Sequence, residues 1–132
     1  MKRLLVVDDD HDVLDSLKLL LETSYEICLA ENGAQALIEM DRGFSPDAIL
    51  LDLKMPILDG FGMMKELTRR GSKVPVLVLS AHPETDALAL DLGARASIRK
   101  PYTYEQLKQA LERILQGAGG GSTRPLNPRS VG

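Results

Sequence analysis

The sequence is poor in cysteine, in long apolar runs and in surplus basic charge. Its single cysteine, Cys28, cannot form a disulfide within the chain, and no signal-peptide pattern precedes the first apolar residues. No apolar run approaches the roughly 18 residues that a membrane-spanning helix needs. Acidic residues outnumber basic ones by 19 to 16, so the basic surface typical of nucleic-acid-binding proteins is absent. We therefore expect a protein of the reducing cytoplasm that binds neither membrane nor nucleic acid directly.

The length and composition fit one domain followed by a short tail. A chain of 132 residues can bury one core without disulfides or a structural metal, and its apolar share of 44% is ordinary for a globular protein. After Gln116 the sequence turns to Gly-Ala-Gly-Gly-Gly-Ser-Thr-Arg-Pro, which is too poor in apolar residues to pack. We predict a domain over residues 1–116 and a flexible tail or linker over residues 117–132.

Short β-branched or leucine-rich runs alternate with longer stretches of helical periodicity. The runs predict strands over residues 3–7, 25–30, 48–52, 75–79 and 97–99. The stretches that follow them predict helices over residues 13–21, 34–42, 61–70, 84–92 and 104–116. Five such pairs predict an α/β fold, and its common form is the flavodoxin-like (βα)5 three-layer sandwich with a parallel sheet in the order 2-1-3-4-5.

The first and last helices carry the clearest periodic signals. The apolar stripe of the first helix is predicted to comprise Val13, Leu14, Leu17, Leu20 and Leu21. The last helix follows Thr103, which can form a capping box with Gln106 three residues later. Its predicted inner face comprises Leu107, Ala110, Leu111, Ile114 and Leu115.

Acidic residues stand at the ends of the first and third predicted strands. Asp8, Asp9 and Asp10 follow the first strand, and Asp52 ends the third. In the order 2-1-3-4-5 these strands are neighbours, so their carboxylates meet where open α/β sheets bind ligands. Carboxylates this close raise one another's pKa unless a cation is present, and hard oxygen ligands suit Mg²⁺ or Mn²⁺. The pattern predicts a divalent-metal pocket suited to phosphoryl transfer.

Two further side chains end the fourth and fifth predicted strands. The hydroxyl of Ser80 can donate a hydrogen bond to a phosphate oxygen, and the ammonium of Lys100 can neutralise charge on a transferring phosphoryl group. Aspartate can accept a phosphoryl group covalently. We therefore predict that Asp52 is the nucleophile and that Ser80 and Lys100 assist it.

These motifs make the chain resemble the receiver domain of bacterial two-component response regulators over residues 2–116. The resemblance rests on four stretches: Leu5-Val6-Val7-Asp8-Asp9-Asp10, Leu51-Asp52-Leu53-Lys54-Met55-Pro56 with Asp59-Gly60, Val76-Leu77-Val78-Leu79-Ser80-Ala81, and Gly93-Ala94 followed by Lys100-Pro101.

The resemblance implies a role for each acidic residue of the pocket. Asp52 stands where the family has its phosphoacceptor. Asp9, Asp52 and the backbone carbonyl of Lys54 stand where it has ligands to Mg²⁺, and Asp8 where it has a ligand that acts through water. The chain is accordingly expected to be a signalling phosphoacceptor rather than an enzyme that turns over a substrate.

Other positions both match the family and depart from it. Ser80 matches the family's hydroxyl residue, and Lys100 matches its lysine, whose bond to the following proline, here Pro101, is typically cis. Ser97 stands where many receivers carry a switching tyrosine or phenylalanine, and Tyr102 where phenylalanine is usual.

The partners implied are a sensor histidine kinase or a phosphotransfer protein as phosphodonor, and a downstream effector protein or an output domain outside this sequence. The face of the fourth and fifth units is the expected partner surface, including for a homodimer through the fourth and fifth helices. Phosphorylation is expected to shift the population between two packings of this face.

Two other functions stay open at this point. Haloacid dehalogenase phosphatases also use an aspartate nucleophile, Mg²⁺, a hydroxyl residue and a lysine, and Asp8 and Asp10 have their D-x-D spacing. That class usually has a cap domain and an acidic pair after the fourth strand, where this sequence has Ser80-Ala81-His82-Pro83. The second alternative is an interaction module with a receiver fold that works without phosphorylation.

Overall fold

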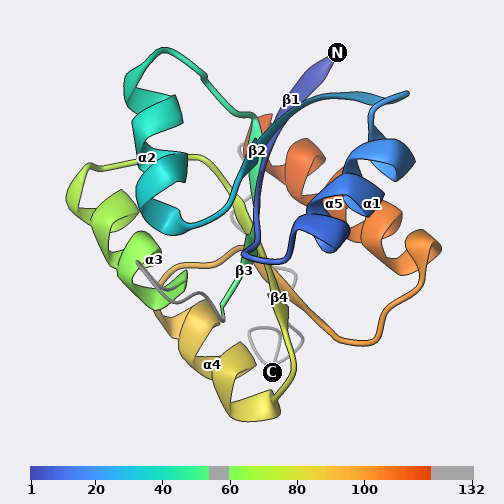
Figure 1. Ribbon diagram of the computed structural model, residues 1–132. Helices are drawn as coiled ribbons and strands as arrows, with labels where there is room; N and C mark the ends of the chain where they lie inside the picture. The colour runs from blue at the N-terminus through green and yellow to red at the C-terminus, as the bar shows by residue number, and fades with distance from the viewer. Residues whose placement is uncertain (54–59, 120–132) are drawn as a thin grey trace.

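The computed structural model of the chain describes residues 1–53 and 60–119, in which strands and helices alternate (Figure 1). The strands are β1 (Lys2–Val7), β2 (Tyr25–Ala30), β3 (Ala48–Asp52), β4 (Val76–Ser80) and β5 (Ala96–Arg99). The helices are α1 (His11–Leu21), α2 (Gly33–Asp41), α3 (Gly60–Arg69), α4 (Pro83–Asp91) and α5 (Tyr104–Gly119). The predicted α/β alternation is confirmed.

The strands form one parallel sheet in the order β2-β1-β3-β4-β5, which confirms the predicted topology. Helices α2, α3 and α4 lie on one side of the sheet, and α1 and α5 lie on the other (Figure 1). The fold is the flavodoxin-like three-layer sandwich. In a parallel sheet all carboxyl ends of the strands point the same way, so Val7, Asp52, Ser80 and Arg99 end at one edge.

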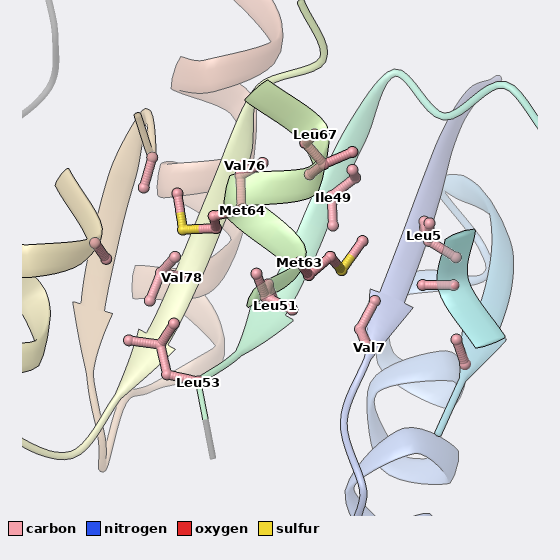
Figure 2. Packing of buried hydrophobic residues seen from close by; sticks show 14 of the residues in the cluster. Leu5, Val7, Ile49, Leu51, Leu53, Met63, Met64, Leu67, Val76 and Val78 are labelled. Atoms are coloured by element: carbon pink, nitrogen blue, oxygen red, sulfur yellow. The ribbon is translucent and has the colours of Figure 1, made fainter. Parts of the chain in front are cut away.

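Two apolar cores hold the sheet between the helix layers. Along β1, Leu4 and Val6 belong to the core beneath α1 and α5, whereas Leu5 and Val7 belong to the core beneath α2 and α3. The second core includes Met63 on α3, whose side chain lies over the sheet among the labelled residues of Figure 2. Because both faces are covered, a central strand such as β3 is buried over its whole length and apolar up to Asp52, rather than alternating between apolar and polar residues.

The inner face of α1 is narrower than its sequence predicts. Leu14, Leu17 and Leu21 are buried, but Leu20 is 46% exposed, so its assignment to the buried stripe is wrong. At 3.6 residues per turn Leu20 lies roughly a quarter of a turn from the centre of the buried face. A helix packed on a sheet buries only the arc that touches it.

The start of α5 confirms the predicted capping box. The backbone N–H of Gln106 donates to Thr103 Oγ1 at 3.1 Å, and the backbone N–H of Thr103 donates to Gln106 Oε1 at 2.9 Å. Helix α5 ends at Gly119, three residues past the predicted end of the domain at residue 116, and residues 120–132 lie outside the described residues. The division into domain and tail therefore stays a prediction. Within the described ranges, no helix combines the length and the apolar character needed to cross a bilayer.

Gly60 begins α3 directly against the end of β3. A Cβ atom at Gly60 would lie 2.7 Å from Leu53 Cα and 3.0 Å from the Asp52 carbonyl oxygen. Both neighbours are backbone atoms, so the strand end and the helix cannot both keep their positions if residue 60 carries a side chain. Gly60 thus fixes how closely α3 approaches the strand that carries Asp52.

We predict that Gly60→Ala lowers the free energy of unfolding by about 1–3 kcal/mol, the usual penalty for an overpacked site. Urea unfolding followed by far-UV circular dichroism measures this change. A variant that unfolds at the same urea concentration as the wild type would show that α3 can move away from Leu53 at little cost.

Candidate functional site

The carboxylates predicted to meet do so because of the register between β1 and β3. Val7 pairs with Leu51, so the next residues, Asp8 and Asp52, lie side by side at the ends of neighbouring strands. The backbone N–H of Asp8 also donates to the Ala30 carbonyl at 3.1 Å, which ties the end of β1 to β2. The positions of both carboxylates therefore follow from the sheet itself.

Asp8, Asp9 and Asp52 form an acidic cluster at this edge. One carboxylate oxygen from each lies within 4.8 Å of the others. Asp8 is 1% exposed and Asp52 is 5% exposed, whereas Asp9 is open to solvent. Three negative charges in so small a space repel one another strongly, and water screens the two buried ones poorly.

The environment of Asp8 shows that the described part of the cluster lacks a partner for one buried carboxylate oxygen. Its Oδ1 accepts the backbone N–H of Asp10 at 2.9 Å, whereas its buried Oδ2 has no hydrogen-bond partner among the described residues. Burial and the charge of Asp52 raise the pKa of Asp8 to about 6, although the Asp10 N–H and the charge of Lys100 act in the opposite direction. An unpartnered carboxylate oxygen beside two further carboxylates fits a hard divalent cation such as Mg²⁺ or Mn²⁺.

Lys100 faces this cluster from the end of β5. Its Nζ lies 3.5 Å from Asp52 Oδ1, and its backbone N–H donates to the Ser80 carbonyl at 2.7 Å. The peptide bond between Lys100 and Pro101 is cis, as the family resemblance implies. The structure thus brings Lys100 together with the acidic cluster, as predicted.

The hydroxyl of Ser80 is engaged elsewhere. Ser80 is 3% exposed, and its Oγ donates to the carboxylate of Asp86 on α4; a second contact, to the His82 carbonyl, is 3.3 Å long. The predicted site therefore assembles around Asp52 and Lys100, while the Ser80 side chain is bound to α4.

Asp86 was not predicted from the sequence. Its Oδ1 accepts Ser97 Oγ at 2.8 Å in addition to Ser80, and its Oδ2 accepts Arg99 Nε at 3.1 Å and lies 3.0 Å from Arg99 Nη2. Burial raises the pKa of Asp86, but the hydrogen bonds from Ser80, Ser97 and Arg99 outweigh it and hold the pKa below its ordinary value. We call these four residues the Asp86 cluster. The available sequence signal was the polar pair Ser97 and Arg99 on the same face of β5.

Two further residues of the sequence motifs, Asp10 and Lys54, are not seen in the acidic cluster. Asp10 is the N-cap of α1, since its Oδ1 accepts the N–H groups of Asp12 at 2.9 Å and Val13 at 3.3 Å. Lys54, predicted to offer its carbonyl to the metal, lies outside the described residues. Among the first three aspartates, then, Asp8 and Asp9 belong to the cluster and Asp10 to the helix.

Comparison with known proteins agrees with this geometry. The model of the response regulator receiver domain matches residues 4–112. The chain belongs to this family, a class of signalling phosphoacceptor in two-component systems, and the cluster of Asp8, Asp9 and Asp52 fits the phosphoacceptor site of that class. The resemblance found in the sequence is confirmed.

Individual relatives are similar over nearly the whole chain. The transcriptional regulatory protein PrrA of Mycobacterium tuberculosis is 38% identical over 98% of this chain, and the response regulator MprA of Mycolicibacterium vanbaalenii is 39% identical over 98%. The chain spans 57% and 59% of the length of these two relatives. A CheY-like receiver domain protein from Methanospirillum hungatei superimposes with a TM-score of 0.84 at 27% identity, over 92% of this chain and 99% of its own.

We predict that removing the charge of Asp8 stabilises the protein when no divalent cation is present. A pKa raised from 3.8 to about 6 penalises the ionised form by up to about 3 kcal/mol at pH 8, where Asp8 is ionised in both the folded and the unfolded state. Asp8→Asn should raise the free energy of unfolding in EDTA by on the order of 1–3 kcal/mol. Adding Mg²⁺ should stabilise the wild type more than the variant, because a ligand of the folded state shifts the unfolding equilibrium.

The matched control is Asp10→Asn, which removes the same charge two residues away and keeps a good N-cap. Its stability should change little in EDTA, and its response to Mg²⁺ should stay that of the wild type. Thermal unfolding of the three proteins gives the comparison. Equal effects of the two substitutions would mean that general negative charge, rather than the cluster, destabilises the apoprotein.

Proposed function

We propose that Asp52 is the phosphoacceptor and that it receives its phosphoryl group from a phosphohistidine on a sensor kinase or a phosphotransfer protein. The observation that carries the proposal is the position of its carboxylate. Asp52 lies within the acidic cluster and also pairs with Lys100 Nζ at 3.5 Å. A nucleophile between a cation site and an ammonium group is placed where the negative charge of a transferring phosphoryl group can be neutralised from two sides.

In the proposed transfer, an Asp52 carboxylate oxygen forms a bond to phosphorus as the phosphorus–nitrogen bond of the donor histidine breaks. The electron pair of that bond stays on the imidazole, which takes up a proton. Lys100 then faces the phosphoryl oxygens, and the Ser80 hydroxyl donates a hydrogen bond to one of them. The carboxylate of Asp52 is thereby converted from a metal-binding anion into an acyl phosphate.

Asp8, Asp9, Asp52 and the carbonyl of Lys54 are the proposed holders of Mg²⁺, with Asp8 acting through water. The unpartnered Oδ2 of Asp8 supports its part in this set, and the role of Lys54 rests on the family resemblance alone. When bound, Mg²⁺ would offset the negative charge shared by the carboxylates and the phosphoryl group.

The output is proposed to pass through the surface of α4, β5 and α5 to an effector protein or to an output domain outside this sequence. Leu88 on α4 is 47% exposed and Tyr104 on α5 is 38% exposed, which supports an apolar contact there, including a homodimer. We place this activity in the cytoplasm, without membrane or direct nucleic-acid contact by these residues. Each domain takes up one phosphoryl group and later loses it to water, unlike an enzyme that turns over a substrate.

We predict that the full chain gains the mass of one phosphoryl group when it is incubated with acetyl phosphate and Mg²⁺, and that Asp52→Asn gains none. Chelation of Mg²⁺ should abolish the gain in the wild type. Intact-mass spectrometry measures all of these. Asp10→Asn, which leaves the cluster intact, should be labelled like the wild type.

Other results would point to other functions. Release of phosphate from a small phosphomonoester over many turnovers would identify a phosphatase of the haloacid dehalogenase type. A folded wild-type protein that stays unlabelled in the presence of Mg²⁺ would indicate an interaction module that works without phosphorylation.

A further inference from the structure

The Asp86 cluster joins the proposed phosphorylation site to helix α4. Asp86 lies in the first turn of α4, and its carboxylate accepts hydrogen bonds from one residue of β4 and two of β5. Ser80 ends β4, and its neighbour Leu79 pairs with Asp52 in the sheet. One buried hydroxyl therefore lies beside the phosphoacceptor strand and is bound to the helix of the proposed output surface.

A serine hydroxyl has a single proton to donate. In this structure the proton of Ser80 is shared with an anionic acceptor, Asp86, and its other contact, the His82 carbonyl, already accepts the Thr85 hydroxyl at 2.7 Å and the Asp86 N–H at 3.2 Å. Asp86 is thus the main acceptor for Ser80. A phosphoryl oxygen on Asp52 can accept a hydrogen bond from the Ser80 hydroxyl only if the hydrogen bond to Asp86 breaks.

We propose that Asp86 is a positioning residue for phosphorylation: its carboxylate competes with the phosphoryl group for the Ser80 hydroxyl and so restrains phosphorylation of Asp52. The inference rests on the proposed function, in which Ser80 donates to the phosphoryl group. When Ser80 leaves, Oδ1 of Asp86 keeps Ser97 at 2.8 Å and Oδ2 keeps Arg99. The Asp86 carboxylate therefore keeps hydrogen-bond donors on both oxygens, so the exchange costs little free energy. The exchange also removes a hydrogen bond between α4 and β4.

Substitutions in the Asp86 cluster can separate competition for the Ser80 hydroxyl from a purely structural role of Asp86 in holding α4 on the sheet. In Asp86→Asn the amide oxygen is expected to face Arg99, because two donors would otherwise oppose each other, and the amide nitrogen then faces Ser80. A nitrogen donor leaves the Ser80 proton free. Ser97→Ala removes the other hydroxyl bound to the same oxygen and leaves Asp86 holding Ser80.

The test measures the initial rate of phosphorylation by acetyl phosphate in Mg²⁺, by intact mass, for a cycle of four full-length proteins. These are the wild type, Asp86→Asn, Ser80→Ala and the double variant. We expect Asp86→Asn to raise the rate about three- to tenfold, the effect expected from the release of one hydrogen bond of typical net strength. Ser80→Ala should lower the rate, and Asp86→Asn should have no further effect in that background.

Ser97→Ala is the matched control and should show no increase over the wild type. If Asp86→Asn does not fold, as judged by thermal unfolding, Asp86→Ala takes its place in the cycle. An equal rate increase with and without Ser80, or no increase in either background, would overturn the inference while leaving phosphorylation of Asp52 intact. Loss of labelling in the wild type would instead refute the proposed function.

Discussion

The site depends on the parallel register between β1 and β3, which forces Asp8 and Asp52 to end side by side. Two unit charges about 4 Å apart repel by on the order of 4 kcal/mol near a protein surface, so the sheet holds them together against their own repulsion. It can do so because β3 is buried over its whole length and β1 over Leu4 to Val7, between the two helix layers. The energy of the apolar cores is therefore what maintains a site that favours a cation.

Two neighbouring groups relieve the repulsion between the carboxylates, each at a different aspartate. Lys100 offsets part of the charge of Asp52 directly, at 3.5 Å, while Asp10 supports Asp8 through its backbone N–H. Neither reaches the buried Oδ2 of Asp8, which is left without a partner in the described part of the chain. The pocket is thus compensated enough to fold but incompletely compensated, which is the condition under which a divalent cation binds favourably.

How much the sequence could predict depends on whether a residue's place follows from topology or from packing. Asp8, Asp52 and Lys100 were predictable, because a strand order alone brings strand ends to one edge. Leu20 was wrongly assigned because periodicity gives the direction of a side chain on a helix but not the width of the arc that the sheet covers. The role of Asp86 does not follow from the sequence, because an acidic residue in a first helical turn is common in itself. Its partners lie on β4 and β5, and no sequence pattern gives the distance of these strands from α4.

The hydrogen bonds of the Asp86 cluster determine how α4 stays attached to the sheet in the proposed exchange of the Ser80 hydrogen bond. Because a carboxylate accepts several hydrogen bonds at once, Asp86 can lose one donor and keep the others. The two oxygens of Asp86 have different partners: Oδ1 accepts hydrogen bonds from Ser80 and Ser97, and Oδ2 accepts one from Arg99. Since the hydrogen bonds from Ser97 and Arg99 do not involve Ser80, α4 keeps its hydrogen bonds to β5 when the hydrogen bond to β4 is lost. We therefore expect α4 to stay attached to the sheet through β5 rather than to detach from it.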